Sequence, residues 1–243
     1  MRIDAITRYP IKGFAAESLD RVTLEPNMRL PGDRVYALRH QDRVPPIQSG
    51  WRPKKYFLQS VQTDVISQIE VRWETDHVDF RHAEDSLTLS RPLQMDAQLA
   101  DWMGARIPDS RGFELTYEPI GLTDEPDAFV SLTNLNTVRA IAEATQTAPN
   151  PARYRGNLLI DGAPAFAESQ WIGAMLHIGA VQFEVIEPIV RCLATECDWQ
   201  GHRDRDFLNR LDAALQTDCC GVFLKTCVGG SLEVGDGLRV HQR

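Results

Sequence analysis

A cysteine follows directly after an arginine where an apolar run of the sequence breaks off. Arg191 and Cys192 close the run that begins at Pro188, and Thr195 lies three residues beyond. A cation at the end of a buried strand requires an anionic partner or contact with water. The guanidinium could therefore favour a thiolate or bind a phosphate. On the residues alone, a buried cysteine that packs as a small apolar side chain is an equally good interpretation.

The other cysteines form no recognisable disulfide or metal motif. They are Cys197, Cys219, Cys220 and Cys227. A zinc site that used them with Cys192 and His202 would lack the paired C-x₂₋₄-C units of common structural sites. Redox sensing by the adjacent pair stays open, although neighbouring cysteines bridge only with strained backbone geometry. Five cysteines without framework spacing indicate a reducing compartment.

Several short motifs occur in an order that resembles one family. The segments are Arg191-Cys192 with Thr195, Asp198 with Gly201, a helical stretch of acidic and basic residues, Gly221-Val222-Phe223, and Gly235-Asp236. This second half resembles the MOSC domain, the C-terminal module of molybdenum cofactor sulfurases. Upstream, Tyr9-Pro10-Ile11-Lys12-Gly13 and Gly32-Asp33-Arg34-Val35-Tyr36 look like the barrel domain that precedes it. The resemblance is to the amidoxime-reducing branch of that superfamily.

The resemblance implies a molybdenum cofactor, in which a pterin holds molybdenum through two dithiolene sulfurs. In the amidoxime-reducing branch, the cysteine that matches Cys192 supplies a thiolate to the metal, and a soft sulfur ligand suits that role. The pterin carries a phosphate, which basic groups would bind. The residues in matching motifs are Lys12, Gly13, Arg34, Arg155 and Asn157. Arg191 is adjacent to the ligand, although neighbours on a strand point to opposite faces.

Some of these assignments have ordinary structural alternatives. Phe223 stands where the reducing branch has a tyrosine near the metal, and phenylalanine cannot donate a hydrogen bond. That departure leaves the polarity of the metal site and the choice of substrate open. Thr133 would also contact the cofactor, but a helix cap explains it equally well. Surface ion pairs are the alternative for the arginines, and a turn cap is the alternative for Asn157.

The resemblance implies an enzyme that reduces N-hydroxylated or N-oxide compounds. No Gly-x-Gly-x-x-Gly or P-loop motif indicates a nucleotide site, and we expect no ferredoxin domain after Gly235-Asp236. Electrons would then come from a separate ferredoxin, flavoprotein or cytochrome-type protein. Two other functions stay open: Cys192 could carry a persulfide as a sulfur donor, or the protein could bind cofactor without catalysis. The superfamily is also associated with pyridoxal phosphate.

Composition indicates a folded protein with one large or two modest domains. The chain has 243 residues, of which 43% are hydrophobic. The net charge of −8 argues against nonspecific nucleic-acid binding. The first residues do not resemble a signal peptide, and no apolar run approaches the roughly 20 residues that cross a bilayer. We expect a cytoplasmic protein with neither a nucleic-acid nor a membrane partner.

Short strands dominate the expected first half of the chain. The ranges are 3–9, 18–24, 34–38, 69–73, 78–81, 86–89 and 113–117. A helix is expected over residues 93–103, with Gly104 at its end, and an irregular loop over residues 42–63. Strands of this length and spacing predict a β-barrel-like domain over residues 1–118.

The second half combines more strands with two helices. Strands are expected over 129–132, 158–160, 181–186, 189–193, 222–228, 231–234 and 238–240. One helix should run from a cap at Thr133 or Asn134 to about residue 147, and another over 207–215 with Asp204 as its cap. Hairpin turns are expected at residues 229–230 and 235–237. The sequence therefore predicts a β-rich α+β protein, with a MOSC β-barrel domain over residues 119–243.

Overall fold

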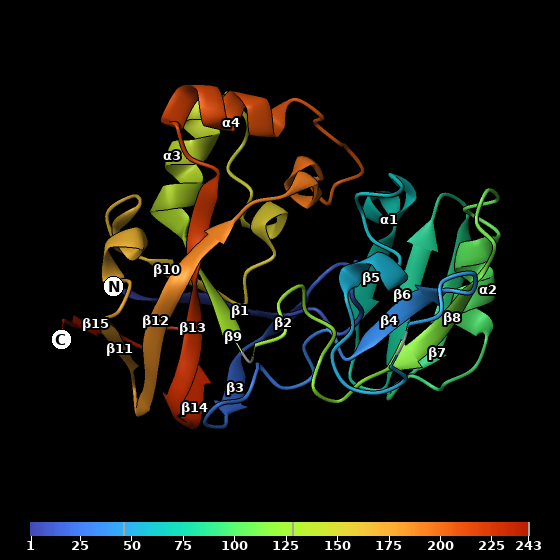
Figure 1. Ribbon diagram of the computed structural model, residues 1–243, viewed down its shortest axis with the longest axis horizontal. Helices are drawn as coiled ribbons and strands as arrows, with labels where there is room; N and C mark the ends of the chain where they lie inside the picture. Colours follow the sequence, from blue (N-terminus) through green and yellow to red (C-terminus); the bar gives the residue numbers. More distant parts are fainter. Residues whose placement is uncertain (46, 128, 243) are drawn as a thin grey trace.

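Two lobes lie side by side in the computed structural model, which describes residues 1–45, 47–127 and 129–242 (Figure 1). The large lobe contains an eight-stranded sheet and the helices α3 (Leu135–Thr145) and α4 (Phe207–Leu215). The small lobe contains β4 to β8 with the helices α1 (Val65–Gln68) and α2 (Gln98–Gly104). The predicted β-rich α+β class is confirmed. No helix among the described residues is long and apolar enough to span a membrane.

The strands of the large sheet come from both ends of the sequence. Their order is β15 (Leu238–His241), β11 (Met175–Ile178), β12 (Val181–Val190), β13 (Cys219–Val228), β9 (Phe129–Asn134), β10 (Leu158–Asp161), β1 (Arg2–Arg8) and β2 (Glu17–Leu19). β9 and β10 are parallel, while the other ladders are antiparallel. Among the described residues these ladders do not close into a barrel. Backbone hydrogen bonds from Ile3 and Leu238 nevertheless join the start of β1 to the segment before β15.

The large sheet has one apolar face and one face of mixed character. Leu132 and Val222 are opposite each other on β9 and β13, and both are fully buried in the main core. Ser131 and Phe223, also opposite each other, must point to the other face because successive strand residues alternate. This alternation turns one row of residues toward the space between the lobes.

Short sheets make up the small lobe. β4 (Tyr36–His40) pairs with β8 (Phe113–Tyr117), and β5 (Glu70–Trp73), β6 (His77–His82) and β7 (Asp85–Ser90) form the expected meander. Its core includes Phe14, Leu38, Phe80, Leu99 and Met103. β4 begins two residues later than expected because Arg34 has a left-handed backbone, with φ of +54°.

The helices follow the predicted pattern more closely than their caps do. The Asn134 side chain accepts a hydrogen bond from the backbone N–H of Asn136 at 3.1 Å, so the expected cap of α3 is confirmed. α4 has the expected bounds, but Asp204 is not its cap and instead pairs with Arg210. α2 starts at Gln98, five residues later than predicted. The side chain of Asp96, just before the helix, accepts a hydrogen bond from the backbone N–H of Gln98.

Strand pairing contradicts several local expectations. β14 (Gly230–Glu233) pairs with β3 (Arg21–Leu24), and β15 pairs with β11, so the predicted hairpins at 229–230 and 235–237 are wrong. The two strands expected over 181–193 are one strand, β12, whose register shifts on either side of Pro188. A bulge accommodates proline because no ladder hydrogen bond is required there. β11 was not predicted, and the single strand expected over 18–24 is divided between β2 and β3.

The predicted domain boundary at residue 118 stays a prediction. β1 and β2 belong to the large sheet, and β3 pairs with β14, so strands from the beginning of the chain complete the large lobe. Residues 42–63 are largely irregular, as expected, with a 3₁₀ turn at Lys54–Tyr56; residue 46 lies outside the described residues. These irregular segments lead toward the space between the lobes.

Candidate functional site

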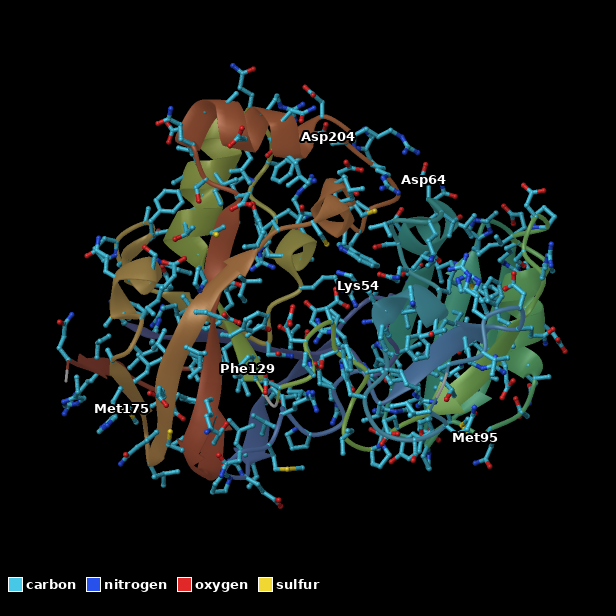
Figure 2. The ribbon with its side chains drawn as sticks, in the orientation of Figure 1. Lys54, Asp64, Met95, Phe129, Met175 and Asp204 are labelled. Carbon is cyan, nitrogen blue, oxygen red and sulfur yellow. The ribbon has the colours of Figure 1, made fainter. Side chains whose placement is uncertain are left out.

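A pocket of about 500 Å³ lies where the two lobes meet. Its walls combine loop residues 12–13, 34, 54, 59–60, 123–125 and 127 with residues of β9, β12 and β13. Figure 2 shows Lys54 in the region between the lobes and Phe129 on the large sheet. The predicted site residues that line this pocket are Lys12, Gly13, Arg34, Arg155, Asn157, Arg191, Cys192 and Phe223. The structure therefore brings together residues that are far apart in the sequence.

Cys192 lies in the pocket wall directly after β12. It begins the 3₁₀ turn η4 (Leu193–Glu196), and its carbonyl accepts hydrogen bonds from the Thr195 N–H at 2.9 Å and Oγ1 at 2.7 Å. These bonds fix the backbone that carries the thiol. Cys192 is exposed, so the interpretation as a buried, space-filling cysteine is wrong.

Arg191 directs its side chain into the large lobe. Nη1 donates to the carbonyl of Tyr154 at 2.8 Å, and Nη2 donates to the carbonyl of Cys220. Nε is enclosed and has no hydrogen-bond partner in the described part of the chain. Burial lowers the pKa of Arg191. Gly221, with φ of +84°, is required beside this side chain, because a Cβ there would lie 2.3 Å from the Leu132 carbonyl oxygen and 3.3 Å from Arg191 Nη2.

Arg155 is held between aromatic rings. Its Cζ lies 4.2 Å from the ring centroid of Tyr9 and 4.4 Å from that of Trp199, and Nη1 donates to the Phe14 carbonyl at 2.8 Å. Nη2 is enclosed without a partner among the described residues. Burial, and then the charge of Arg34, lower the pKa of Arg155 to about 10. A guanidinium in this position would be stabilised by an anion.

Arg34 reaches the same end of the pocket but has its own carboxylate. It pairs with buried Asp33, which also accepts a hydrogen bond from the N–H of Tyr9 at 2.9 Å. Its Nη2 donates to the Arg155 carbonyl at 3.1 Å. Arg34 therefore supports the left-handed backbone of Arg155, whose φ is +54°.

Lys12 and Lys54 share the carboxylate of Asp124. Lys12 is buried and donates to Asp124 and to the Leu122 carbonyl, while Lys54 donates to the other Asp124 oxygen at 3.1 Å. Burial lowers the pKa of Lys12 despite this partner. Burial also opposes the charge on Lys54, but Asp124 outweighs it and raises the pKa of Lys54, with a smaller contribution from Cys192. The two lysines hold the pKa of Asp124 well below its usual range even though burial acts in the opposite direction.

Asn157 links three strands at the base of the pocket. Its Oδ1 accepts hydrogen bonds from Ser131 N–H at 3.2 Å and Oγ at 2.8 Å, and its Nδ2 donates to the Thr7 carbonyl at 3.2 Å. The turn-cap alternative does not describe these contacts. Only one amide hydrogen is left for a ligand, so this side chain chiefly positions β1, β9 and β10.

Two other predicted residues serve the backbone around the pocket. Gly13 has φ of +87°, and a Cβ there would lie 3.1 Å from the carbonyl of Leu58. Thr133 does not line the pocket; it is buried beside Gly156, and its Oγ1 has no partner among the described residues. It is not the cap of α3, which is Asn134.

An irregular segment between η4 and α4 fastens the two lobes beside the pocket. Arg203 donates from Nε to Glu196 at 2.8 Å and from Nη1 to Asp64 of the small lobe at 3.2 Å. Arg205 also contacts Asp64, at 3.0 Å. Figure 2 shows Asp64 at the edge of the small lobe, facing the segment that carries Asp204. The same segment supplies Trp199, which packs on the small-lobe core.

Replacing Arg203 with methionine should lower the free energy of unfolding by about 3–5 kcal/mol, because it leaves the buried Glu196 carboxylate without its cation. Urea unfolding followed by tryptophan fluorescence measures this change. Arg205→Met is the matched control: Arg205 contacts the same Asp64 but has a side chain that is 70% exposed, so its loss should cost at most about 1 kcal/mol. Equal effects of both substitutions would contradict the assignment of Arg203 as the interlobe contact that stabilises the fold.

Other pocket residues were not singled out from the sequence. They are Lys54, Asp124, Arg153, Tyr154 and Glu187. The Cζ atom of Arg153 lies 4.3 Å from the ring centroid of Phe207, and its Nη1 donates a hydrogen bond to the Thr195 carbonyl at 2.6 Å. The second contact joins this part of the pocket wall to η4. Arg153 could have been noticed in the sequence because it lies two positions before Arg155. Asp124 lies in a loop, where no periodicity indicates which way a side chain points.

Residues 120–239 match the MOSC domain family. The chain contains a MOSC domain. The matched range includes Arg155, Asn157, Arg191, Cys192 and Phe223, so one wall of the pocket belongs to the MOSC domain. Lys12, Gly13 and Arg34 come from the segment before it. Membership of the amidoxime-reducing branch stays a prediction.

One solved structure supports the fold of the chain. The chain is similar to the YuaD protein from Bacillus subtilis, with a TM-score of 0.53 and 12% identity over 100% of this chain and 96% of that chain. At this identity the likeness concerns the fold alone. The chain also matches YiiM from Geobacillus stearothermophilus over 47% of this chain and 54% of the other, with 16% identity and a TM-score of 0.37. No curated protein sequence matches the chain.

Proposed function

We propose that the pocket binds a molybdenum–pterin cofactor and that the protein reduces N-hydroxylated or N-oxide compounds. MOSC domains are associated with molybdenum cofactor sulfurases and related oxidoreductases, which supports this class of function. One observation carries the proposal. Arg155 and Arg191 line the same pocket as the exposed Cys192, and each has an enclosed guanidinium nitrogen with no hydrogen-bond partner among the described residues.

The residues of the pocket fit such a cofactor. Arg155 Nη2 and Arg191 Nε are enclosed donors without partners among the described residues, and an anionic phosphate would satisfy a buried guanidinium. Cys192 would add a soft sulfur ligand to those of the pterin. Over the described residues, no three His, Cys, Asp or Glu side chains form a metal site of their own. The pterin would therefore have to contribute most of the ligands.

When bound, the cofactor would supply the two-electron reduction of the substrate. The side chains of the protein would bind and orient the reactants. Arg155 would hold the phosphate, while Lys54, which pairs with Asp124, adds a positive charge to the pocket that Cys192 also lines. Val190 and Leu193 border the thiol with exposed apolar surface. Electrons would come from a separate ferredoxin, flavoprotein or cytochrome-type protein.

The exposure of Cys192 also favours a second candidate function. A persulfide on this sulfur would be accessible to an acceptor and would lie in the pocket that Lys54 also lines. In that case the protein would carry sulfur for the synthesis or maturation of a cofactor. Sulfur released by cyanide from the purified protein, and lost in Cys192→Ser, would identify this function.

Protein purified from a host that makes molybdopterin should contain molybdenum at a substantial fraction of one atom per chain. The arginines and the thiol would retain the cofactor through separate contacts, to phosphate and to metal. Elemental analysis gives the metal content, and fluorescence after oxidation gives the pterin content. Metal-free protein from such a host, or stoichiometric zinc, would contradict the reductase proposal. Protein from a host unable to make molybdopterin is the control.

A further inference from the structure

A pair of aromatic rings forms part of the pocket wall. Phe129 and Phe223 stack with ring centroids 5.4 Å apart and planes inclined by 29°. Both side chains are partly exposed, and both line the pocket. They project from the same face of β9 and β13, since Phe223 is opposite Ser131 and Phe129 lies two residues from Ser131. Such rings bind flat apolar groups and also attract organic cations.

A free carboxylate lies beside these rings. Glu187 on β12 is directly opposite Phe223 on β13. Opposite residues of an antiparallel pair share a face, with Cβ atoms about 4.5–5.5 Å apart. Glu187 is exposed and lines the pocket, and its side chain has neither an ion pair nor a hydrogen bond within the described ranges. Its negative charge is therefore available to a ligand that rests on the rings.

Among the other carboxylates of the pocket wall, Asp124 and Asp127 interact with cations, and Glu125 lies on the loop before β9 rather than on the sheet. Asp124 is shared by Lys12 and Lys54, and the charge of Asp127 acts on Arg29. Glu184, three residues before Glu187 on β12, is directly opposite Lys225 and does not line the pocket. Glu187 thus differs from Asp124 in having no ion pair among the described residues, and from Glu184 in lining the pocket.

We propose that Phe129, Phe223 and Glu187 form a subsite for an organic cation, such as an ammonium group on an aryl or other flat apolar molecule. The identification of this cation as part of the substrate rests on the function proposed above. An anion would bind at Arg155 and Arg191, which line the same pocket without carboxylate partners among the described residues. The pocket is therefore suited to two ligands of opposite charge.

Three probes of similar size and different charge test this subsite: benzylammonium, benzyl alcohol and phenylacetate. Calorimetric titration of the purified full chain at pH 7, with inorganic phosphate present to occupy these arginines, gives their affinities. Benzylammonium should bind about tenfold more tightly than benzyl alcohol, and phenylacetate most weakly. Equal affinity for all three, preference for phenylacetate, or no binding of benzylammonium would overturn the proposal.

Two glutamates on the same strand provide matched variants. Glu187→Gln keeps the size of the exposed side chain and should reduce the preference for benzylammonium over benzyl alcohol to about twofold or less. Glu184→Gln should retain the full preference. A preference that survives Glu187→Gln, or that is lost equally in both variants, would overturn the assignment. These titrations require no molybdenum, so their outcome is separate from that of the metal analysis.

Discussion

Replacing Cys192 with serine should abolish the reduction of a hydroxylamine or amidoxime by the cofactor-loaded, artificially reduced protein. Serine retains the size of the side chain but exchanges a soft thiol for a hydroxyl that stays protonated near neutral pH. The loss of rate should exceed the roughly 10- to 100-fold cost of removing an outer-shell partner of a metal site. Pterin content can remain high, because Arg155 and Arg191 are unchanged.

Other cysteines supply the controls for this experiment. Cys219 is partly exposed and Cys227 is exposed, but neither lines the pocket, so serine at either position should leave most of the activity. Cys220 is buried, and burial raises the pKa of its thiol to about 12, which makes it a poor source of thiolate. Activity that persists in Cys192→Ser but disappears in Cys220→Ser would place the metal ligand at Cys220 and not at Cys192.

Local sequence patterns predicted the strands and helices that are determined by residues close together in the sequence. Alternation over residues 3–9 predicted β1, and the bounds of β8 and α4 were predicted correctly. Asn134 was identified as the α3 cap because its side chain can accept a backbone N–H of the first turn. Such signals depend on residues within a few positions of one another, so one sequence is sufficient to detect them.

Strand pairing depends on contacts that no local pattern contains. The glycines at 229–230 indicated a hairpin, but β14 pairs with β3, some two hundred positions earlier in the chain. Gly229 is required there for another reason, since a Cβ would lie 2.5 Å from the carbonyl of Leu24. The glycines therefore mark a close approach to another strand and not a hairpin turn, and the partner of that strand could not be derived from them.

The candidate site was predictable where residues lie in recognisable motifs. Cys192, Arg155 and Lys12 line one pocket, as the resemblance implied. The other charged residues of the pocket could not be predicted in the same way. Asp124 lies on an irregular loop, and the position of Glu187 beside Phe223 depends on how β12 pairs with β13. The chemical types of the site could thus be inferred from sequence, whereas which charges are neutralised and which are free required the fold.

Arginines that pair with carboxylates and arginines that do not should respond differently to substitution, and this difference gives a specific prediction for cofactor binding. Arg203 has two carboxylates, and Arg155 has none among the described residues. A buried ion pair that loses one partner leaves an uncompensated charge, whereas removing an unpaired cation removes a desolvation cost. Replacement by methionine should therefore lower the stability of the protein at Arg203 but change it little at Arg155.

Arg155→Met should lower the affinity for the cofactor about 10- to 100-fold, because a charge-assisted hydrogen bond contributes roughly 1.5–3 kcal/mol. Stability should change little, since the lost carbonyl hydrogen bond is offset by the removal of an enclosed donor, Nη2. Pterin content per folded chain and urea unfolding measure the two quantities on the same sample. Arg203→Met is the matched control, with stability reduced and pterin content per folded chain preserved. If Arg155→Met unfolds early yet retains normal pterin, Arg155 is a structural residue and the phosphate must bind elsewhere in the pocket.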